Sequence, residues 1–399
     1  MSPDCIPDCI IVGAGPVGVI AALGLARAGI AVLVLEAEPS VVESPRAVVY
    51  HWAVLDGLDR LGILADVERA GVRKQDYGYR IFKTGEQIRF SMAVLEGHAP
   101  HPYNLHLGQH RLAEIALDHL RRLPNASVRF GARVVRVAQD ESGVTVTAET
   151  EAGPETVRAA WAIGADGGRS AVRRLLGLDF PGTTWPERFV ATNLHYDFEA
   201  HGLARATFQV DDVEGAVIVK IDDEGLWRCT YSEDAALPED GVLDRLPGRF
   251  RRLLPGNGDW NLVAAAPYRM HQRAAERFRV GRVVLAGDAA HVTNPAGGLG
   301  LTSGLFDAFV LSEALAAVIR GETDDAVLDR YAAIRRQIFL ERVSPQAAEN
   351  KRFVYHSGDP ARLESDLANL RCTVADPELL RRRLFFLKSL ETPSLLQKI

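Results

Sequence analysis

Three glycines and one carboxylate near the start of the chain have the types and spacing needed to hold a dinucleotide. Gly13, Gly15 and Gly18 form a G-x-G-x-x-G turn, in which the backbone approaches a pyrophosphate and no Cβ can intrude. Glu36 stands where a carboxylate accepts hydrogen bonds from ribose hydroxyls. Because this carboxylate disfavours a 2′-phosphate, the pattern predicts FAD or NAD here rather than NADP.

A second glycine-rich turn lies far along the chain. Gly287 and Asp288 follow the apolar run 283–286, and the loop 294–300 opens onto a helix predicted over residues 301–319. Asp288 can accept hydrogen bonds from cofactor hydroxyls, and the helix N-terminus offers backbone donors to negative charge. Two such turns, each with an acid, favour one extended cofactor held at both ends.

The elements that must position these residues follow from hydrophobic patterning. Residues 9–12 and 30–35 read as buried strands around a helix over 16–28, and further helices are predicted over 53–64 and 109–120. Residues 134–146 read as a hairpin with its turn at 140–143. Four strand-like segments without intervening helices predict an antiparallel sheet: 189–196, 206–210, 215–221 and 226–231.

The predicted fold class is therefore α/β, a Rossmann-like FAD-binding domain with an inserted antiparallel β-sheet substrate domain and a helical C-terminus. We expect the FAD-binding domain to comprise residues 1–75, 104–178 and 271–350, the substrate-binding domain 76–103 and 179–270, and the C-terminal helical segment 351–399.

Composition excludes several classes of function. The 399 residues carry a net charge of −6, which gives no electrostatic footprint for nucleic acid or an anionic membrane. No metal site is expected, because neither the four cysteines nor His98, His101 and His106 have ligand spacing. The apolar N-terminal run lacks a basic leader and is broken by glycines, so a cytoplasmic protein with reduced thiols is predicted.

Three motifs in order give the chain a resemblance to a known family. They are GAGPVG at residues 13–18, DGGRSAVR at 166–173, and GDAAH at 287–291 with Pro295 and Gly300 following. On these motifs the chain resembles the single-component (group A) FAD-dependent aromatic hydroxylases, typified by p-hydroxybenzoate hydroxylase, through nearly its whole length. The resemblance implies the p-hydroxybenzoate hydroxylase fold.

The resemblance also implies cofactor contacts. Glu36 would bind the adenosine ribose, Arg46 and Gln109 would contact FAD, and Asp288 would hold the ribitol region. Arg169 and Arg269 occupy positions where related enzymes contact NADPH. The family usually has asparagine where this chain has Thr302. The full expected cofactor set is Gly13, Gly15, Pro16, Val17, Gly18, Glu36, Ala37, Arg46, Gln109, Val135, Asp166, Asp288, Pro295, Gly298, Gly300, Leu301 and Thr302.

The chemistry implied by the resemblance is ring hydroxylation. NADPH or NADH would reduce FAD, O2 would add to give a flavin C4a-hydroperoxide, and one oxygen atom would pass to a small phenolic, amino-aromatic or N-heteroaromatic substrate. A base that removes the phenolic proton would help. The expected catalytic residues are His51, Tyr50, Pro295 and His195, and the substrate residues on the inserted sheet are Tyr196, Gln209, Arg228 and Tyr231.

Other readings stay open from sequence alone. An FAD-dependent oxidase or reductase would grip FAD in the same way, and a ring hydroxylase of a lipid-quinone pathway would share the mechanism. A non-enzymatic binding protein resembling the GTPase dissociation inhibitors would reuse the fold without flavin. The expected partners are the substrate, O2 and NAD(P)H, with no nucleic acid and no membrane, and the chain is compatible with a homodimer.

Overall fold

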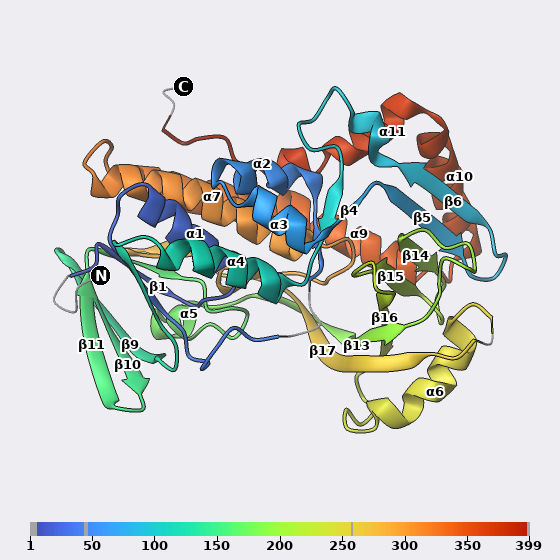
Figure 1. Ribbon diagram of the computed structural model, residues 1–399, viewed down its shortest axis with the longest axis horizontal. Coiled ribbons are helices and arrows are strands. Elements are labelled where there is room, and N and C mark those ends of the chain that lie inside the picture. Colours follow the sequence, from blue (N-terminus) through green and yellow to red (C-terminus); the bar gives the residue numbers. More distant parts are fainter. Residues whose placement is uncertain (1–5, 44–46, 257, 397–399) are drawn as a thin grey trace.

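Six short strands form the sheet of the predicted FAD-binding part of the molecule, here called the first half (Figure 1). The computed structural model describes residues 6–43, 47–256 and 258–396. All neighbouring strands are parallel except β18 and β19. Parallel strands are covered on both faces, which explains why they read as continuous apolar runs. In sheet order the strands are β18 (Arg279–Val280), β19 (Val283–Leu285), β12 (Trp161–Gly164), β1 (Cys9–Val12), β2 (Val32–Leu35) and β8 (Ala126–Arg129).

Three helices bury this sheet. α1 (Pro16–Arg27) contacts both α4 (Gln109–Arg121) and α7 (Leu299–Ile319), and Figure 1 shows the three side by side. α1 ends where Gly29 takes a φ of +85°, a left-handed conformation that favours glycine. α7 is long and apolar enough to cross a membrane, with a mean hydropathy of 1.5, but 78% of its most apolar window is buried. It is the core helix of this half.

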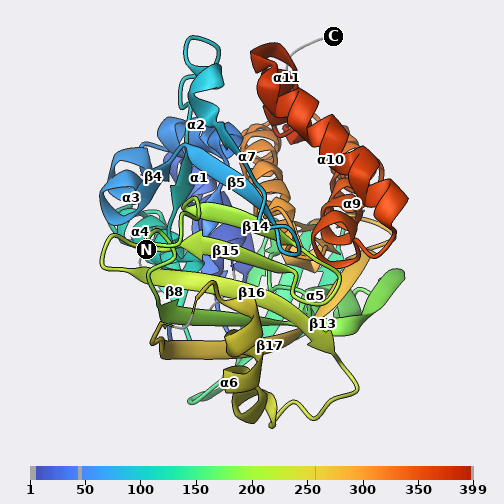
Figure 2. The same ribbon diagram turned by 90° about the vertical axis from the view of Figure 1, so that its right-hand side faces the viewer.

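The second large sheet has eight strands, antiparallel except for the pair β14 and β5. This confirms the antiparallel sheet predicted from the sequence. Figure 2 shows α6 (Val242–Leu253) on one side of it and α9 and α10 toward the other. The sequence analysis did not predict α6, which contains Pro247. In sheet order the strands are β20 (His291–Val292), β17 (Asn261–Ala274), β13 (Gly182–His195), β16 (Leu226–Asp234), β15 (Ala216–Lys220), β14 (Ala206–Val210), β5 (Asp76–Ile81) and β6 (Gln87–Ser91).

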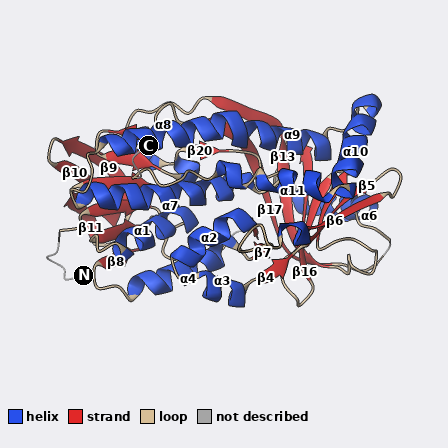
Figure 3. Ribbon diagram, turned by 90° about the horizontal axis from the view of Figure 1, so that it is seen from above, coloured by secondary structure: helices blue, strands red, loops and turns tan. Residues whose placement is uncertain are grey.

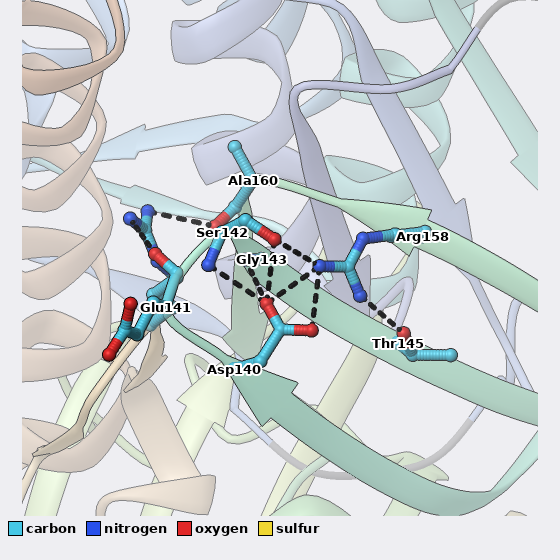
Figure 4. A network of polar contacts seen from close by, with 8 residues as sticks. Asp140, Glu141, Ser142, Gly143, Thr145, Arg158 and Ala160 are labelled. Carbon is cyan, nitrogen blue, oxygen red and sulfur yellow. Dashed lines mark hydrogen bonds and ion pairs between the residues drawn. The ribbon is translucent and has the colours of Figure 1, made fainter.

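The predicted hairpin is part of a three-stranded antiparallel sheet, β9 (Arg133–Asp140), β10 (Gly143–Thr150) and β11 (Gly153–Ala159). Arg158 donates to both carboxylate oxygens of Asp140, at 2.7 and 2.8 Å, and to Ser142 Oγ at 2.6 Å (Figure 4). Water screens such exposed pairs. The network therefore orients the turn more than it stabilises the fold.

The helix predicted over residues 53–64 is confirmed as α2 (Trp52–Arg60), but its predicted end was wrong by four residues. Gly62, with φ of +59°, lies between α2 and the next helix, α3 (Leu64–Ala70), and no α-helix continues through that conformation. The remaining helices are α5 (Ala171–Leu175), α8 (Ala326–Ile338), α9 (Ser344–Tyr355), α10 (Pro360–Ala375) and α11 (Pro377–Phe385), with a π-helical turn Phe339–Val343 and 3-10 turns Met92–Leu95, Gly287–Ala289 and Lys388–Leu390. A small sheet contains β3 (Val49–Tyr50), β7 (Asn104–His106) and β4 (Val72–Lys74).

Seen from above, the helices of the first half lie at one end of the molecule and the eight-stranded sheet lies at the other (Figure 3). α10 and α11 pack beside β5 and β6. A parallel sheet with helices, an antiparallel insert and a helical C-terminus confirm the predicted fold class.

Candidate functional site

Four neighbouring strands of the parallel sheet end at the same level. Val12 is the register partner of both Leu35 and Gly164, and Gly164 is in turn the partner of Leu285. The residues that follow these strand ends are the glycine turn, Glu36, the DG motif and the GD motif. The structure therefore brings together motifs that are far apart in the sequence, at the edge where open α/β sheets bind ligands.

The first turn shows where the backbone is crowded and where it is open. A Cβ atom on Gly13 would lie 2.5 Å from the Ala165 carbonyl oxygen, and one on Gly18 would lie 2.0 Å from the Gly13 carbonyl oxygen. A Cβ atom on Gly15 would meet no atom of the described residues within 4 Å. Two of these glycines are required by packing of the protein, whereas Gly15 leaves the open approach that a pyrophosphate needs.

Glu36 is fixed beside that opening. Its carboxylate accepts hydrogen bonds from the backbone N–H groups of Ala14, at 2.7 Å, and Glu38, at 3.0 Å. A cavity of about 150 Å³ is lined by Gly15, Pro16, Glu36, Gln109 and His110, among other residues. A carboxylate at the mouth of an open glycine turn fits the ribose and diphosphate of FAD.

The second glycine turn packs directly on the first. A Cβ atom on Gly287, which has a φ of +59°, would lie 2.9 Å from Val17 Cγ2. A Cβ atom on Gly304 of α7 would lie 2.8 Å from the same methyl group. Asp288 is exposed beside this contact. The two turns predicted to hold one cofactor are thus neighbours in space.

In the DG motif, the carboxylate of Asp166 accepts hydrogen bonds from the protein itself. The donors are the backbone N–H groups of Ala171, at 2.6 Å, and Val172, at 3.1 Å, so Asp166 caps α5. Arg173 of the same motif donates to the carbonyl oxygens of Gly168, at 2.7 Å, and Ala289, at 2.8 Å. This arginine ties the DG motif to the GD motif, while a direct FAD contact of Asp166 stays a prediction.

His51 and Thr302 form a buried pair next to the loop that opens α7. His51 Nδ1 lies 2.7 Å from Thr302 Oγ1, and that hydroxyl donates to the Gly298 carbonyl oxygen at 3.1 Å. Because the single hydroxyl proton is used on Gly298, His51 Nδ1 must donate and Nε2 keeps its lone pair. Burial lowers the pKa of His51 to about 4, so the ring is neutral at neutral pH. Thr302, the departure from the family pattern, thus orients a neutral histidine.

The other predicted cofactor and catalytic residues are less closely grouped. Tyr50 is fully buried, its hydroxyl group has no hydrogen-bond partner among the described residues, and burial raises its pKa. His195 is exposed near the end of β13, and Val135 is 39% exposed on β9. Pro295 is exposed, and Ala37, Gly300 and Leu301 are half-buried. Arg46 lies outside the described residues.

The four predicted substrate residues lie on two faces of the eight-stranded sheet. Tyr196 and Tyr231 pack in the core beneath α6, and Gln209 donates to the carbonyl oxygen of Glu214. Arg228 points to the opposite face, because strand neighbours alternate and Trp227 and Cys229 belong to the α6 core. Its Nε donates to Asn193 Oδ1 at 3.0 Å, and burial lowers its pKa to about 10.

Arg169 and Arg269 belong to a cationic group that includes two residues missed from the sequence. The pKa of His271 is lowered by partial burial and by the positive charges of Arg273, Arg269 and Arg169. Thr184 Oγ1 accepts from Arg273 at 2.8 Å and lies 2.9 Å from His271 Nδ1. The alternation of residues 269, 271 and 273 along β17 was the sequence signal for this shared face.

Comparisons with known proteins identify the family to which this chain is similar. The family model described as an FAD binding domain matches residues 7–344. A 6-hydroxy-3-succinoylpyridine 3-monooxygenase, HspB of Pseudomonas putida (strain DSM 28022 / S16), is 47% identical over 385 residues, covering 96% of this chain and 98% of the relative. A para-nitrophenol 4-monooxygenase of Pseudomonas sp. (strain WBC-3) is 46% identical over 399 residues, covering 99% and 98%.

Solved structures that are similar to this chain include a monooxygenase and a hydroxylase. The crystal structure of p-nitrophenol 4-monooxygenase PnpA from Pseudomonas putida DLL-E4 superposes with a TM-score of 0.94 at 44% identity, covering 97% of this chain and 99% of that one. The ternary complex of aklavinone-11 hydroxylase with FAD and aklavinone gives a TM-score of 0.79 at 28% identity, covering 89% and 71%.

Substituting Gly15 should separate cofactor binding from folding. Gly15→Ala places its Cβ in open space and should leave the melting temperature of the protein without FAD near that of the wild type. It should weaken FAD binding by about tenfold or more, equivalent to about 1.4 kcal/mol. Gly18→Ala is the matched comparison and should destabilise the protein itself by about 1–3 kcal/mol, because its Cβ overlaps the Gly13 carbonyl. Unchanged FAD affinity in Gly15→Ala, measured by flavin fluorescence titration, would contradict the assignment of this turn.

Proposed function

Because the chain belongs to the FAD binding domain family and is an FAD-dependent monooxygenase, we propose that it hydroxylates a phenol or hydroxypyridine with a second substituent para to the hydroxyl group. We further propose that oxygen is added at the carbon that carries this substituent. The names of two relatives support the position of attack. Carbon 4 of para-nitrophenol carries the nitro group, and carbon 3 of 6-hydroxy-3-succinoylpyridine carries the succinoyl group.

FAD, reduced by NAD(P)H, supplies one electrophilic oxygen atom from O2 when it is bound, and the other oxygen atom leaves as water. The ionised hydroxyl group of the substrate pushes electron density to the para carbon, where a C–O bond forms. A nitro group then leaves as nitrite with the bonding electron pair, and loss of the proton from the new hydroxyl group gives a quinone.

The observation that carries this proposal is the neutral, oriented imidazole of His51. Its Nε2 has a lone pair because Nδ1 is held by Thr302, and the ring packs against Gly298, where a Cβ atom would lie 3.1 Å from His51 Cε1. A neutral histidine has a lone pair that can accept a hydrogen bond from a phenolic hydroxyl group, while burial, which lowers the pKa of His51, disfavours a stable imidazolium ion. We propose that His51 acts as the base by accepting this hydrogen bond while the phenol reacts.

Arg228 is the best candidate to recognise the para substituent. It is a buried cation on the face of the large sheet opposite α6, and its guanidinium is oriented by Asn193. A buried guanidinium favours a partner with negative charge, such as a nitro or carboxylate oxygen.

For the electron donor, we propose that Arg169, Arg269 and Arg273 bind the phosphates of NAD(P)H. Within residues 6–43, 47–256 and 258–396, no carboxylate forms an ion pair with any of the three, so the group can bind an anion without displacing one. The domain boundaries given above are likewise proposals. A cytoplasmic location, a homodimer and the lack of nucleic-acid and membrane partners stay predictions.

The product of 4-nitrophenol tests the proposed position of attack. The FAD-loaded protein should release nitrite in proportion to the NAD(P)H consumed in the presence of substrate. Its isomer 3-nitrophenol, which has no substituent para to the hydroxyl group, is the control and should release none. A product that retains the nitro group on a newly hydroxylated ring would contradict attack at the substituted carbon.

Replacing His51 should affect weakly acidic phenols most. His51→Asn should lower kcat by about a hundredfold for a phenol that is neutral at the assay pH, because the base is lost. The decrease should be much smaller for 4-nitrophenol at a pH where it is already ionised. Steady-state kinetics with both substrates measure this difference, and equal losses for the two would show that His51 does not act as the base.

The arginine group should control the affinity for the nucleotide. Arg169→Ala and Arg269→Ala should each raise the KM for NAD(P)H about tenfold, since a hydrogen bond to a charged group is lost. FAD content should not change. Arg251→Ala, an exposed arginine of α6, provides the control. A wild-type KM in both variants would place the nucleotide elsewhere.

A further inference from the structure

A carboxylate lies buried within the most apolar helix of the protein. Asp307 is 0% exposed in α7, and both of its carboxylate oxygens accept hydrogen bonds. Oδ2 lies 2.7 Å from His291 Nε2 and 2.9 Å from the backbone nitrogen of Gly287, and Oδ1 lies 2.6 Å from Arg335 Nε. Although burial alone would raise the pKa of Asp307, His291 and Arg335 lower it below its ordinary value. Asp307 is therefore a charged acceptor at the centre of the core.

On one side, this carboxylate controls the second glycine turn. It fixes the backbone N–H of Gly287, which directly precedes Asp288 in the GD motif. The carbonyl oxygen of Leu285, at the end of β19, accepts a hydrogen bond of 3.0 Å from the hydroxyl group of Tyr331. The segment that precedes Asp288 is therefore held at Leu285 by Tyr331 of α8 and at Gly287 by Asp307 of α7.

On the other side, Arg335 connects the carboxylate to the C-terminal segment. One terminal nitrogen donates to the Leu390 carbonyl oxygen at 2.6 Å and to Thr392 Oγ1 at 3.1 Å, and the other donates to the backbone and side chain of Ser303. A cavity of about 530 Å³ separates parts of α8 from residues 389–395. Leu390 and Leu395 also anchor this segment in the core, and Arg335 is the residue that links it to Asp307.

We propose that Asp307 is a positioning residue for FAD, and that the Asp307–Arg335 pair couples FAD binding to docking of residues 389–395. FAD requires one conformation of the Gly287–Asp288 peptide. When FAD binds, it therefore favours the positions of Asp307 and Arg335 that stabilise this conformation. By thermodynamic linkage, FAD then stabilises the docked C-terminal segment, and the docked segment strengthens FAD binding by the same factor. This inference rests on the placement of FAD at the GD motif.

The first test follows the release of FAD from the full-length holoenzyme by the rise in flavin fluorescence on dilution. Asp307→Asn keeps the shape of the side chain but removes its charge, and should raise the FAD dissociation constant about tenfold or more. Glu322→Gln, an exposed carboxylate just beyond α7 whose side chain pairs with Arg320, is the control and should stay within twofold of the wild type. If Asp307→Asn lowers the melting temperature but leaves the dissociation constant unchanged, Asp307 is only a core residue and the proposal is overturned. A wild-type protein that does not bind FAD would instead refute the cofactor assignment.

The second test uses a milder change at the far end of the network and does not depend on Asp307→Asn folding. In the wild type, FAD should slow hydrogen exchange of the backbone in residues 389–395. Thr392→Val removes one acceptor of Arg335 and should reduce this FAD-dependent protection several-fold. Ser394→Ala loses the bonds to Glu313 and from the Leu396 backbone but none to Arg335, and should retain the protection. Exchange of the wild-type segment that does not respond to FAD would overturn the coupling.

Discussion

The parallel pairing of β2, β1, β12 and β19 is the constraint on which the rest of the structure depends. Because the register makes these strands end together, three motifs from distant parts of the sequence meet at one edge. The contact is close enough that Gly13, Gly18 and Gly287 have no space for a side chain. Gly15 alone of the first turn faces open space. Of these turn glycines, Gly13, Gly18 and Gly287 are therefore needed for packing within the protein, whereas Gly15 leaves space for the cofactor.

Polar groups buried behind this edge hold it in position. Asp307 accepts from the GD turn, Arg173 joins the DG motif to the same turn, and Thr302 orients His51. A buried polar group without a partner costs free energy, so these hydrogen bonds favour one arrangement of each side chain. The positions of the candidate reactive groups are therefore set by hydrogen bonds within the protein.

The sequence was sufficient for the features that depend on local pattern. The strand, glycine turn and helix at residues 9–28, the 140–143 hairpin turn and the antiparallel insert were all predicted from apolar periodicity and glycine spacing. The break at Gly62 was missed because the apolar spacing continues through it. α6 was missed although Val242, Leu246, Phe250 and Leu253 have helical spacing, because a proline such as Pro247 normally indicates the end of a helix.

The sequence predicted the parts of the candidate site that belong to a motif. It did not predict the contacts that depend on tertiary packing. Alternation along a strand shows that two residues share a face, but not which face meets α6. Arg228 and Tyr231, three positions apart on β16, should by this alternation point to opposite faces, so their grouping followed the choice of strand and not the pattern. The structure places Tyr196, Gln209 and Tyr231 on the side opposite Arg228. The link between His51 and Thr302 joins residues 251 positions apart, and no spacing rule shows it.

The most direct test of the account is anaerobic reduction of the purified, FAD-containing protein by NADPH or NADH, followed through the absorbance of the oxidised flavin, with and without a para-substituted phenol. The account predicts a flavin that is reduced by a nicotinamide and reduced many-fold faster when the phenol is bound. A bound flavin that neither nucleotide reduces would contradict it, because the electrons would then have to enter from another source.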